Sequence, residues 1–188
     1  MSRGWKIIIG VIVVLLLIVS LWYLNGYNHT VALNEAVNGA WAQVENQLKR
    51  RYDLIPNLVE TVKGYAKHET ELFTHIADVR KSYFQANTPQ EGIDQSRQME
   101  GLLSRLLLLQ ENYPELKANE SFLRLQDSLE GTENRIATER KRYNDAVKAL
   151  NTYIRTFFGR FFAGQVGVEK AEYFETPEAE KATPQVKF

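Results

Sequence analysis

Apolar side chains follow helical spacing over most of this chain, and most regularly between Asn119 and Phe158. The stripe advances in steps of three and four, which place its members on one side of a helix. We predict one helix at about 119–160, capped by Asn119 and about 60 Å long at 1.5 Å per residue. A rod of that length cannot bury its own stripe, so other helices must lie along it. The stripe consists of Phe122, Leu125, Leu129, Thr132, Ile136, Glu139, Tyr143, Val147, Leu150, Ile154 and Phe157.

A similar stripe begins near residue 28 and continues past Pro56 without a change of register. Inside a helix a proline removes a hydrogen bond and clashes with the preceding turn, at a cost of roughly 3 kcal/mol. At the first position of a new helix it costs almost nothing. The pattern therefore favours two helices, at about 28–52 and 56–87. A single kinked helix across Pro56 is the alternative.

A third helix is predicted at about 90–112, after the breaker Thr88-Pro89. The run Leu102–Leu109 places apolar groups all round it, so the faces turned away from the core need another cover. A second copy of the chain would supply that cover, and so would a central position for this helix among the other three. After Gly164 the chain becomes turn-rich, and we expect residues 165–188 to form an extended, partly disordered tail.

The N-terminal pattern is different, because Ile7–Leu24 is eighteen residues without a charge. This length suits a single membrane-spanning helix. A cleaved signal peptide is the competing interpretation. Against it, the apolar run is long, and Leu24–Tyr27 lacks a small-x-small cleavage site. We predict a retained anchor, with the lipid bilayer as a partner through this segment.

The basic residues near the anchor predict its orientation. Arg3 and Lys6 precede the apolar run, and the next basic residue is Lys49. By the excess of positive charge on the cytoplasmic side, residues 1–6 lie in the cytoplasm and 7–24 span the plasma (inner) membrane. A helical domain at 25–164 then follows on the periplasmic or extracellular side. The predicted fold class is all-α, an N-terminal transmembrane helix followed by an up-and-down four-helix bundle.

Composition narrows the function. Without Arg3 and Lys6, the 23 basic residues fall to 21, against 23 acidic ones, so we expect no nucleic-acid partner. The absence of cysteine excludes disulfides, thiolate metal sites and a cysteine nucleophile. No Gly-x-Ser-x-Gly or phosphate-binding glycine loop is present. We therefore expect neither catalysis nor a cofactor nor a small-molecule substrate.

Several strings resemble the LemA family of bacterial membrane proteins: Gln47–Val59, Leu125–Ile136, Glu139–Asn144 and the tail Tyr173–Glu175. In Phe157–Phe162 the chain departs from many relatives, which have a proline after the first phenylalanine. The resemblance implies a helical bundle beside a membrane, without agreed catalytic residues or cofactor. One relative takes part in building magnetosome membranes, which implies a role in organising membranes.

Three residues offer a rival hypothesis of a metal-dependent envelope enzyme. His68, Glu71 and His75 are spaced i, i+3 and i+7, so on one helix they share a face. The spacing is neither His-Glu-x-x-His nor the paired Glu-x-x-His of di-iron bundles. We therefore favour histidines that bind no metal.

Charged residues on the predicted seams suggest a polar cluster. Thr132 and Glu139 occupy stripe positions that should be apolar, and such groups fix register at a cost in stability. We expect Glu133 or Glu139 to pair with Arg50 or Arg51 across the bundle. A partner-binding groove lined by the same residues is the alternative. The cluster comprises Arg50, Arg51, Asp53, Glu133, Glu139 and Arg140.

The last predicted site lies at the end of the fourth helix. In an up-and-down bundle this end and the start of the first helix lie together, so it faces the bilayer. Aromatic residues with an arginine suit a segment among lipid headgroups. We predict that Phe157, Phe158, Arg160, Phe161 and Phe162 touch the membrane surface, unless the aromatic groups only close the core. The predicted function is an anchored envelope scaffold or adaptor that binds other membrane proteins.

Overall fold

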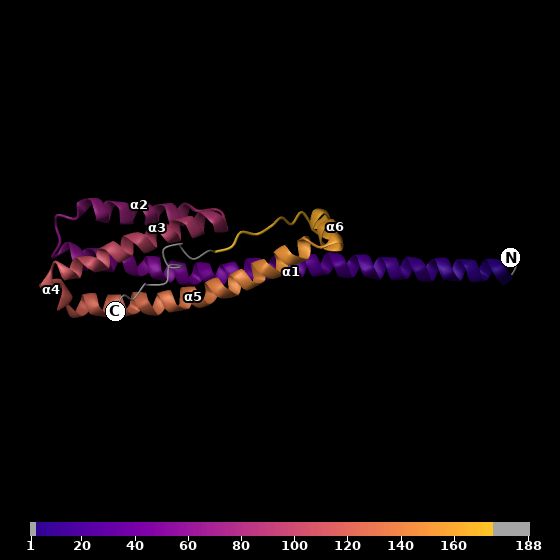
Figure 1. The fold of residues 1–188 in the computed structure, drawn as a ribbon, viewed down its shortest axis with the longest axis horizontal. Coiled ribbons are helices and arrows are strands. Elements are labelled where there is room, and N and C mark those ends of the chain that lie inside the picture. Colours follow the sequence, from indigo (N-terminus) through magenta and orange to yellow (C-terminus); the bar gives the residue numbers. More distant parts are fainter. Residues whose placement is uncertain (1–2, 175–188) are drawn as a thin grey trace, which may run out of the picture. The chain divides into compact units, whose positions relative to one another are not determined.

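The structure, a computed structural model, describes residues 3–174, and these form helices and connecting loops without a strand. The elements are α1 (Arg3–Lys63), α2 (Thr70–Gln85), α3 (Pro89–Leu108), the 3₁₀ turn η1 (Leu109–Glu111), α4 (Pro114–Lys117), α5 (Glu120–Ile154) and α6 (Phe157–Val166) (Figure 1). The all-α fold and the long apolar N-terminal helix are confirmed. Of the expected tail at 165–188, the part from 175 onward lies outside the described residues.

The chain divides into two compact units. One, called the N-terminal unit, is Met1–Gly39 with Asp145–Ala171, and the other, called the bundle unit, is Ala40–Asn144 with Glu172–Phe188. The long helices α1 and α5 contribute to both. The expected single domain at 25–164 is therefore divided, since each unit draws on both an early and a late part of the chain.

Four helical segments build the bundle unit: α1 from Ala40, α2, α3 and α5 up to Asn144. Successive segments reverse direction, and α2 and α3 lie along each other (Figure 1). The predicted stripes meet in its core, because apolar groups at helical spacing leave water together. The most deeply buried are Leu48, Ile55, Leu58, Val62, Ile76, Ile93, Met99, Leu106, Phe122 and Ile136.

The break predicted at Pro56 is wrong, because α1 passes through Pro56 and ends at Lys63. Proline cannot donate to the carbonyl four residues earlier, which belongs to Tyr52. In the structure Arg80 Nε of α2 donates to the Tyr52 carbonyl oxygen at 3.1 Å. Pro56 itself is exposed, so its ring lies outside the core. A long-range hydrogen bond thus satisfies the carbonyl that the proline leaves open.

Helix α3 ends four residues earlier than predicted, and Thr88 caps it by accepting from Glu91 N at 3.2 Å. The bundle unit itself covers most side chains of the leucine run Leu102–Leu109. Leu103, Leu106 and Leu109 are buried, and Leu102 and Leu107 are half-buried. Within the run only Leu108 is fully exposed as a large apolar side chain.

The predicted helix at 119–160 is wrong at its C-terminal end. Asn119 does cap α5, since its Oδ1 accepts from Phe122 N at 2.9 Å. However, α5 stops at Ile154, and Thr156 caps a separate α6 by accepting from Gly159 N at 3.0 Å. A Cβ at Gly159 would overlap the Tyr153 carbonyl oxygen, so the tight turn requires glycine here.

In the N-terminal unit, aromatic rings of α6 pack against α1, and Phe162 is the most buried of them. Phe162 is 1% exposed and lies against Trp22 and Tyr23, with ring centroids 5.1 and 5.7 Å apart. A Cβ at Gly26 would overlap this ring, so the glycine makes room for it. Thr30, one turn further along α1, is buried and donates to the Gly26 carbonyl. Together these contacts place α6 beside the end of the Ile7–Leu24 segment.

Candidate functional site

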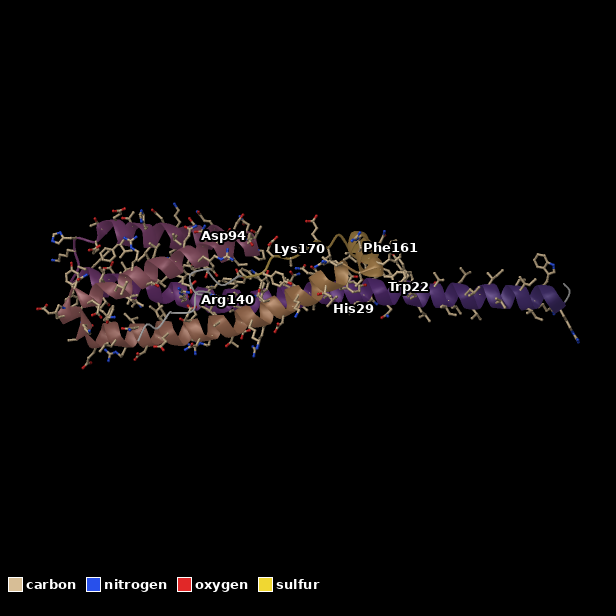
Figure 2. All side chains as sticks on the ribbon, in the orientation of Figure 1. Trp22, His29, Asp94, Arg140, Phe161 and Lys170 are labelled. Atoms are coloured by element: carbon tan, nitrogen blue, oxygen red, sulfur yellow. The ribbon has the colours of Figure 1, made fainter. Side chains whose placement is uncertain are left out.

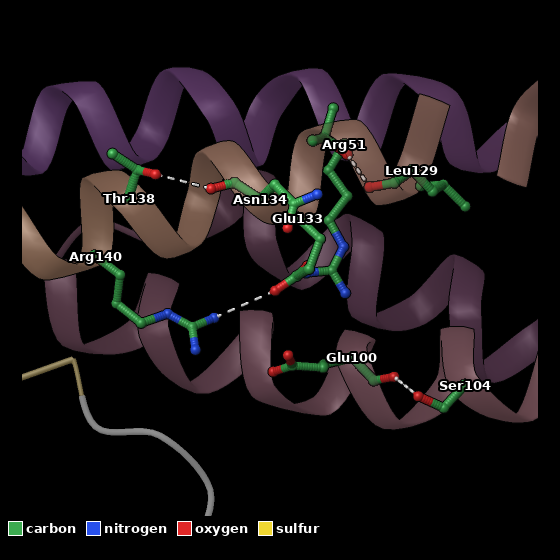
Figure 3. A network of polar contacts seen from close by, with 9 residues as sticks. Arg51, Glu100, Ser104, Leu129, Glu133, Asn134, Thr138 and Arg140 are labelled. Carbon is green, nitrogen blue, oxygen red and sulfur yellow. Dashed lines mark hydrogen bonds and ion pairs between the residues drawn. The ribbon is translucent and has the colours of Figure 1, made fainter. Parts of the chain in front are cut away.

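A charge network crosses the bundle unit between α1 and α5 (Figure 3). Arg51 Nη1 donates to Glu133 Oε2 at 2.8 Å, and the Arg51 side chain is 5% exposed. Arg140 lies further along α5, and its Nη2 is 3.8 Å from Glu133 Oε1. One carboxylate therefore faces two buried guanidinium groups. The structure contains one of the cross-bundle pairs that the sequence allowed, Arg51 with Glu133.

Helix geometry brings Arg51 inside. It follows Leu48 by three positions and precedes Ile55 by four, and both of these are in the core. Its stem therefore shares their face of α1. A buried ion pair contributes little net stability, but removing one partner is costly because the other charge stays out of water. Loss of one partner would therefore destabilise the contact between α1 and α5.

The other members of the predicted polar cluster lie elsewhere. Arg50 and Asp53 are exposed on α1. Glu139 accepts from Arg142 Nη1 at 2.7 Å, three residues along the same helix. The predicted cluster therefore divides into a network of Arg51, Glu133 and Arg140, a separate Glu139–Arg142 pair, and the exposed Arg50 and Asp53.

Next to the network lies a cavity of about 350 Å³. Its walls combine carboxylates with one guanidinium and leucine side chains, among them Arg51, Glu100, Leu103, Leu129 and Glu133. Glu100 belongs to α3, where Ser104 donates to its carbonyl oxygen at 2.9 Å (Figure 3). The lining contains no histidine, cysteine or lysine, and Arg51 is its one basic residue.

The sequence analysis missed a second feature of the bundle unit, in which α5 holds the chain that follows α6. Asn144 binds both backbone groups of Phe174, accepting from its N–H at 2.8 Å and donating to its carbonyl at 2.9 Å. The Phe174 ring is buried, with the Arg140 guanidinium 4.4 Å from its centroid and Trp41 at 6.5 Å. Tyr143 donates to the Glu172 carbonyl at 2.8 Å. The available signal was an aromatic pair, Tyr173-Phe174, in a polar segment expected to be disordered.

Three tyrosine hydroxyls of the bundle unit titrate abnormally. Burial raises the pKa of Tyr52 well above its ordinary value, although the positive charge of Arg51 opposes this. Burial also raises the pKa of Tyr83, to which the carboxylate of Glu45 adds. For Tyr143 burial again raises the pKa, and Glu172 acts in the same direction. The rings of Tyr52 and Tyr83 stack at 4.0 Å. All three side chains belong to the buried core.

The arrangement expected for the rival metal site is not present. Because α1 ends at Lys63 and α2 begins at Thr70, His68 lies in the intervening turn. It therefore does not share a helical face with Glu71 and His75, as the spacing argument required. Within residues 3–174 no three histidine, cysteine, aspartate or glutamate side chains are grouped to hold a metal ion. His75 lies instead on the rim of a groove between α2 and α3, with Asp78 and Arg105.

The N-terminal unit carries the other candidate surface. Every residue of Ile7–Leu24 is exposed, and this part of α1 is the one described stretch that is long and apolar enough to cross a membrane, with a mean hydropathy of 3.0. Its side chains project from α1 without neighbours until Trp22, where α6 begins to cover the helix (Figure 2). Phe157 is 85% exposed, and Phe158 and Phe161 are also exposed. Of the predicted surface segment, Phe162 alone is directed inward against α1.

A recess of about 610 Å³ lies beside these aromatic groups. It is lined by Trp22, Arg155, Phe157, Phe158, Arg160 and Phe161. Both arginines are exposed, and Arg155 was not among the predicted residues. The recess therefore combines an aromatic wall with two cations at the end of the apolar segment.

Comparison with known proteins places these features in a family. The LemA family matches residues 40–188. The magnetosome proteins MamQ 1 and MamQ 2 of Paramagnetospirillum magneticum are each 26% identical over 175 residues, which covers 79% of this chain and 64% of theirs. Protein LemA of Metamycoplasma hominis is 21% identical, covering 85% of this chain and 73% of its own. This chain thus spans less than two thirds of the length of the two MamQ proteins. Because the family match covers most of its length, the chain belongs to the LemA family.

Proposed function

We propose that this chain is a single-pass, membrane-anchored scaffold or adaptor protein of the cell envelope without catalytic activity. The observation that carries the proposal is the segment Ile7–Leu24, whose eighteen residues are all exposed. An uncharged helix of this length is stable where its surroundings are also apolar. The similarity to proteins named for the magnetosome rather than for a reaction supports a non-catalytic role.

The proposed orientation places the N-terminus in the cytoplasm and the bundle unit outside it. Arg3 and Lys6 support this, because they are the only charged residues before Glu35. A reporter fused at the C-terminus tests it. Alkaline phosphatase, which is active outside the cytoplasm, should be active in the fusion, and a fluorescent protein that folds in the cytoplasm should stay dark. The reverse result would overturn the orientation and leave the anchoring intact.

The proposed partners are other membrane proteins and a second copy of this chain. The bundle unit offers an exposed Leu108 and a groove of about 470 Å³ between α2 and α3, with Leu102 and Arg105 in its lining. The leucine run Leu102–Leu109 is the proposed contact between copies, and its exposed part is small. We therefore expect contact between copies to be weaker than contact with other proteins.

Site-specific photocrosslinking in intact cells tests the scaffold role. A photoreactive amino acid replaces Leu108 or Arg105, and Lys141, which is exposed on α5, serves as the control position. We expect discrete products from the first two positions, identified by mass spectrometry as membrane proteins or as this chain. The same background pattern from all three positions would contradict a partner surface on the α2–α3 side. Release of the chain by alkaline carbonate would contradict the anchor itself.

A further inference from the structure

We propose that α6 lies in the lipid headgroup layer, and that Arg155 and Arg160 bind the phosphate of anionic phospholipids there. The inference rests on the proposed anchoring of Ile7–Leu24. It adds a specific occupant for the recess on α6, namely a phospholipid headgroup. It also places the C-terminal end of the apolar segment Ile7–Leu24 at the level of the headgroups.

The position of α6 on α1 is the first argument. Phe158 and Phe162 contact Trp22, with ring centroids 5.3 and 5.1 Å apart. Trp22 lies two residues before the end of the apolar segment at Leu24. If that segment lies in hydrocarbon, α6 lies where hydrocarbon gives way to headgroups. Tryptophan and tyrosine are enriched at this depth in membrane proteins, and Tyr23 and Tyr27 follow directly on α1.

The exposed face of α6 is the second argument. Of the aromatic residues of this helix, Phe162 is the buried one. Phe157, Phe158 and Phe161 remain outside, and in water such a cluster would be unfavourable. A helix that carries exposed aromatic groups on one face suits the boundary between headgroups and acyl chains. The exposed rings continue the apolar surface of Ile7–Leu24, so one lipid environment would cover both.

Charge is the third argument, and it selects the lipid. Arg155 precedes the Thr156 cap of α6, and Arg160 lies within the helix, yet both line the same recess as Trp22. No charged residue lies on α1 between Lys6 and Glu35. The end of the apolar segment therefore receives its positive charge from α6 and the residue beside it. Guanidinium groups bind phosphate through several hydrogen bonds, and basic residues near an anionic leaflet are attracted to it.

A single-cysteine experiment tests the position of α6. The chain has no cysteine, so Phe157→Cys carries one fluorophore, and Leu123→Cys is the matched control on an exposed apolar position of the bundle unit. Each full-length chain is reconstituted into phosphatidylcholine vesicles with a spin-labelled headgroup lipid. We expect strong quenching at position 157 and little at position 123. Equal, weak quenching in chains that float with the vesicles would overturn the inference while leaving the anchor intact. Failure to float would instead overturn the proposed function.

A second comparison tests the phosphate site. Spin-labelled phosphatidylglycerol should quench the position-157 fluorophore about thirtyfold more effectively than spin-labelled phosphatidylcholine, because each of the two arginines contributes roughly 1 kcal/mol at an anionic surface. Arg155→Gln with Arg160→Gln should abolish that preference and leave the quenching by phosphatidylcholine unchanged. Arg105→Gln, on the α2–α3 groove, is the control and should keep the preference. A preference that survives the double substitution would contradict binding by these two arginines.

Discussion

In the bundle unit, α1 presents an apolar residue to the core every three or four positions, whereas in the N-terminal unit the same helix leaves eighteen successive uncharged residues exposed. The first pattern needs other helices of the chain, and the second needs an apolar solvent. Polar groups differ in the same way. The bundle unit buries Arg51 and Arg140 beside a carboxylate, while the N-terminal unit keeps Arg155 and Arg160 exposed. The comparison shows that one continuous helix carries two patterns, one that packs against other helices and one that suits apolar surroundings.

Alkaline pH should produce the largest difference in stability between the two units. Tyr52, Tyr83 and Tyr143 all lie in the bundle unit, and their pKa values in the folded chain exceed the unfolded value of about 10. Below about pH 10 both states hold the proton, so the tyrosines contribute a constant stability. Above it the unfolded state loses protons first, and the stability falls as the pH rises towards the folded pKa values.

Phenolate absorbance and circular dichroism, recorded together, measure this effect. We expect a first group of tyrosines to ionise without loss of helix, and a second group to ionise together with cooperative loss of part of the helix. The N-terminal unit contains none of the three tyrosines whose pKa is raised. In lipid, α6 should therefore stay helical after the bundle unit has lost helix. If all the tyrosines ionised near pH 10 with the helix intact, the three hydroxyls would not be buried as described.

Removing the shared carboxylate should produce the next largest effect. Glu133→Gln leaves Arg51 and Arg140 buried without a counterion, and such losses reach about 3–5 kcal/mol for a fully buried pair. Because the Glu133 side chain is 39% exposed, we expect a smaller loss of about 2 kcal/mol. Glu120→Gln, which removes an exposed pair with Arg124, should cost less than about 0.5 kcal/mol. Urea unfolding of both variants measures the difference, and equal unfolding midpoints would show that the network is not stabilising.

A glycine substitution in the N-terminal unit should have the smallest effect. Gly26→Ala places a methyl group where the Phe162 ring lies, so α6 should detach more often. Hydrogen exchange of α6 amides should accelerate about tenfold, which corresponds to about 1.4 kcal/mol. Gly39→Ala, with open space at its Cβ, should instead stabilise α1 by about 0.5–1 kcal/mol. Identical exchange in the two variants would mean that Phe162 does not hold α6.

Sequence periodicity predicted much of this architecture for a physical reason. The stripe of α5 from Phe122 to Leu150 is mostly buried, because an apolar group at helical spacing has no better place than the shared core. The absence of charge from Ile7–Leu24 likewise predicted a long apolar helix. Both signals depend on residues close together in the chain. The charged residues were less well predicted, because the sequence left open whether Glu133 or Glu139 pairs with Arg50 or Arg51, and the structure pairs Glu133 with Arg51.

What the sequence did not reveal depends on one contact between helices and on local contacts in the turn after α5. The helix continues through Pro56 because Arg80 supplies a donor from another helix, and no local pattern announces that bond. The end of α5 depends on a side-chain cap by Thr156 and on a close approach at Gly159. His68 does not lie on the predicted metal-binding face, because α1 ends at Lys63 and His68 falls in the turn that follows. The Arg80 bond forms only when α2 packs against α1, whereas the cap by Thr156 and the turn at Gly159 are local and end α5 although the apolar spacing continues.

The Asn144–Phe174 contact limits where this chain can be truncated without loss of packing. Helix boundaries alone would suggest trimming the chain after Val166, where α6 ends. That cut would remove Phe174 and leave a hole beside Trp41 and Tyr143, with the Asn144 amide deprived of both backbone partners. The eight residues from 167 to 174 thus include a plug for the interior, and a soluble fragment needs them to remain well packed.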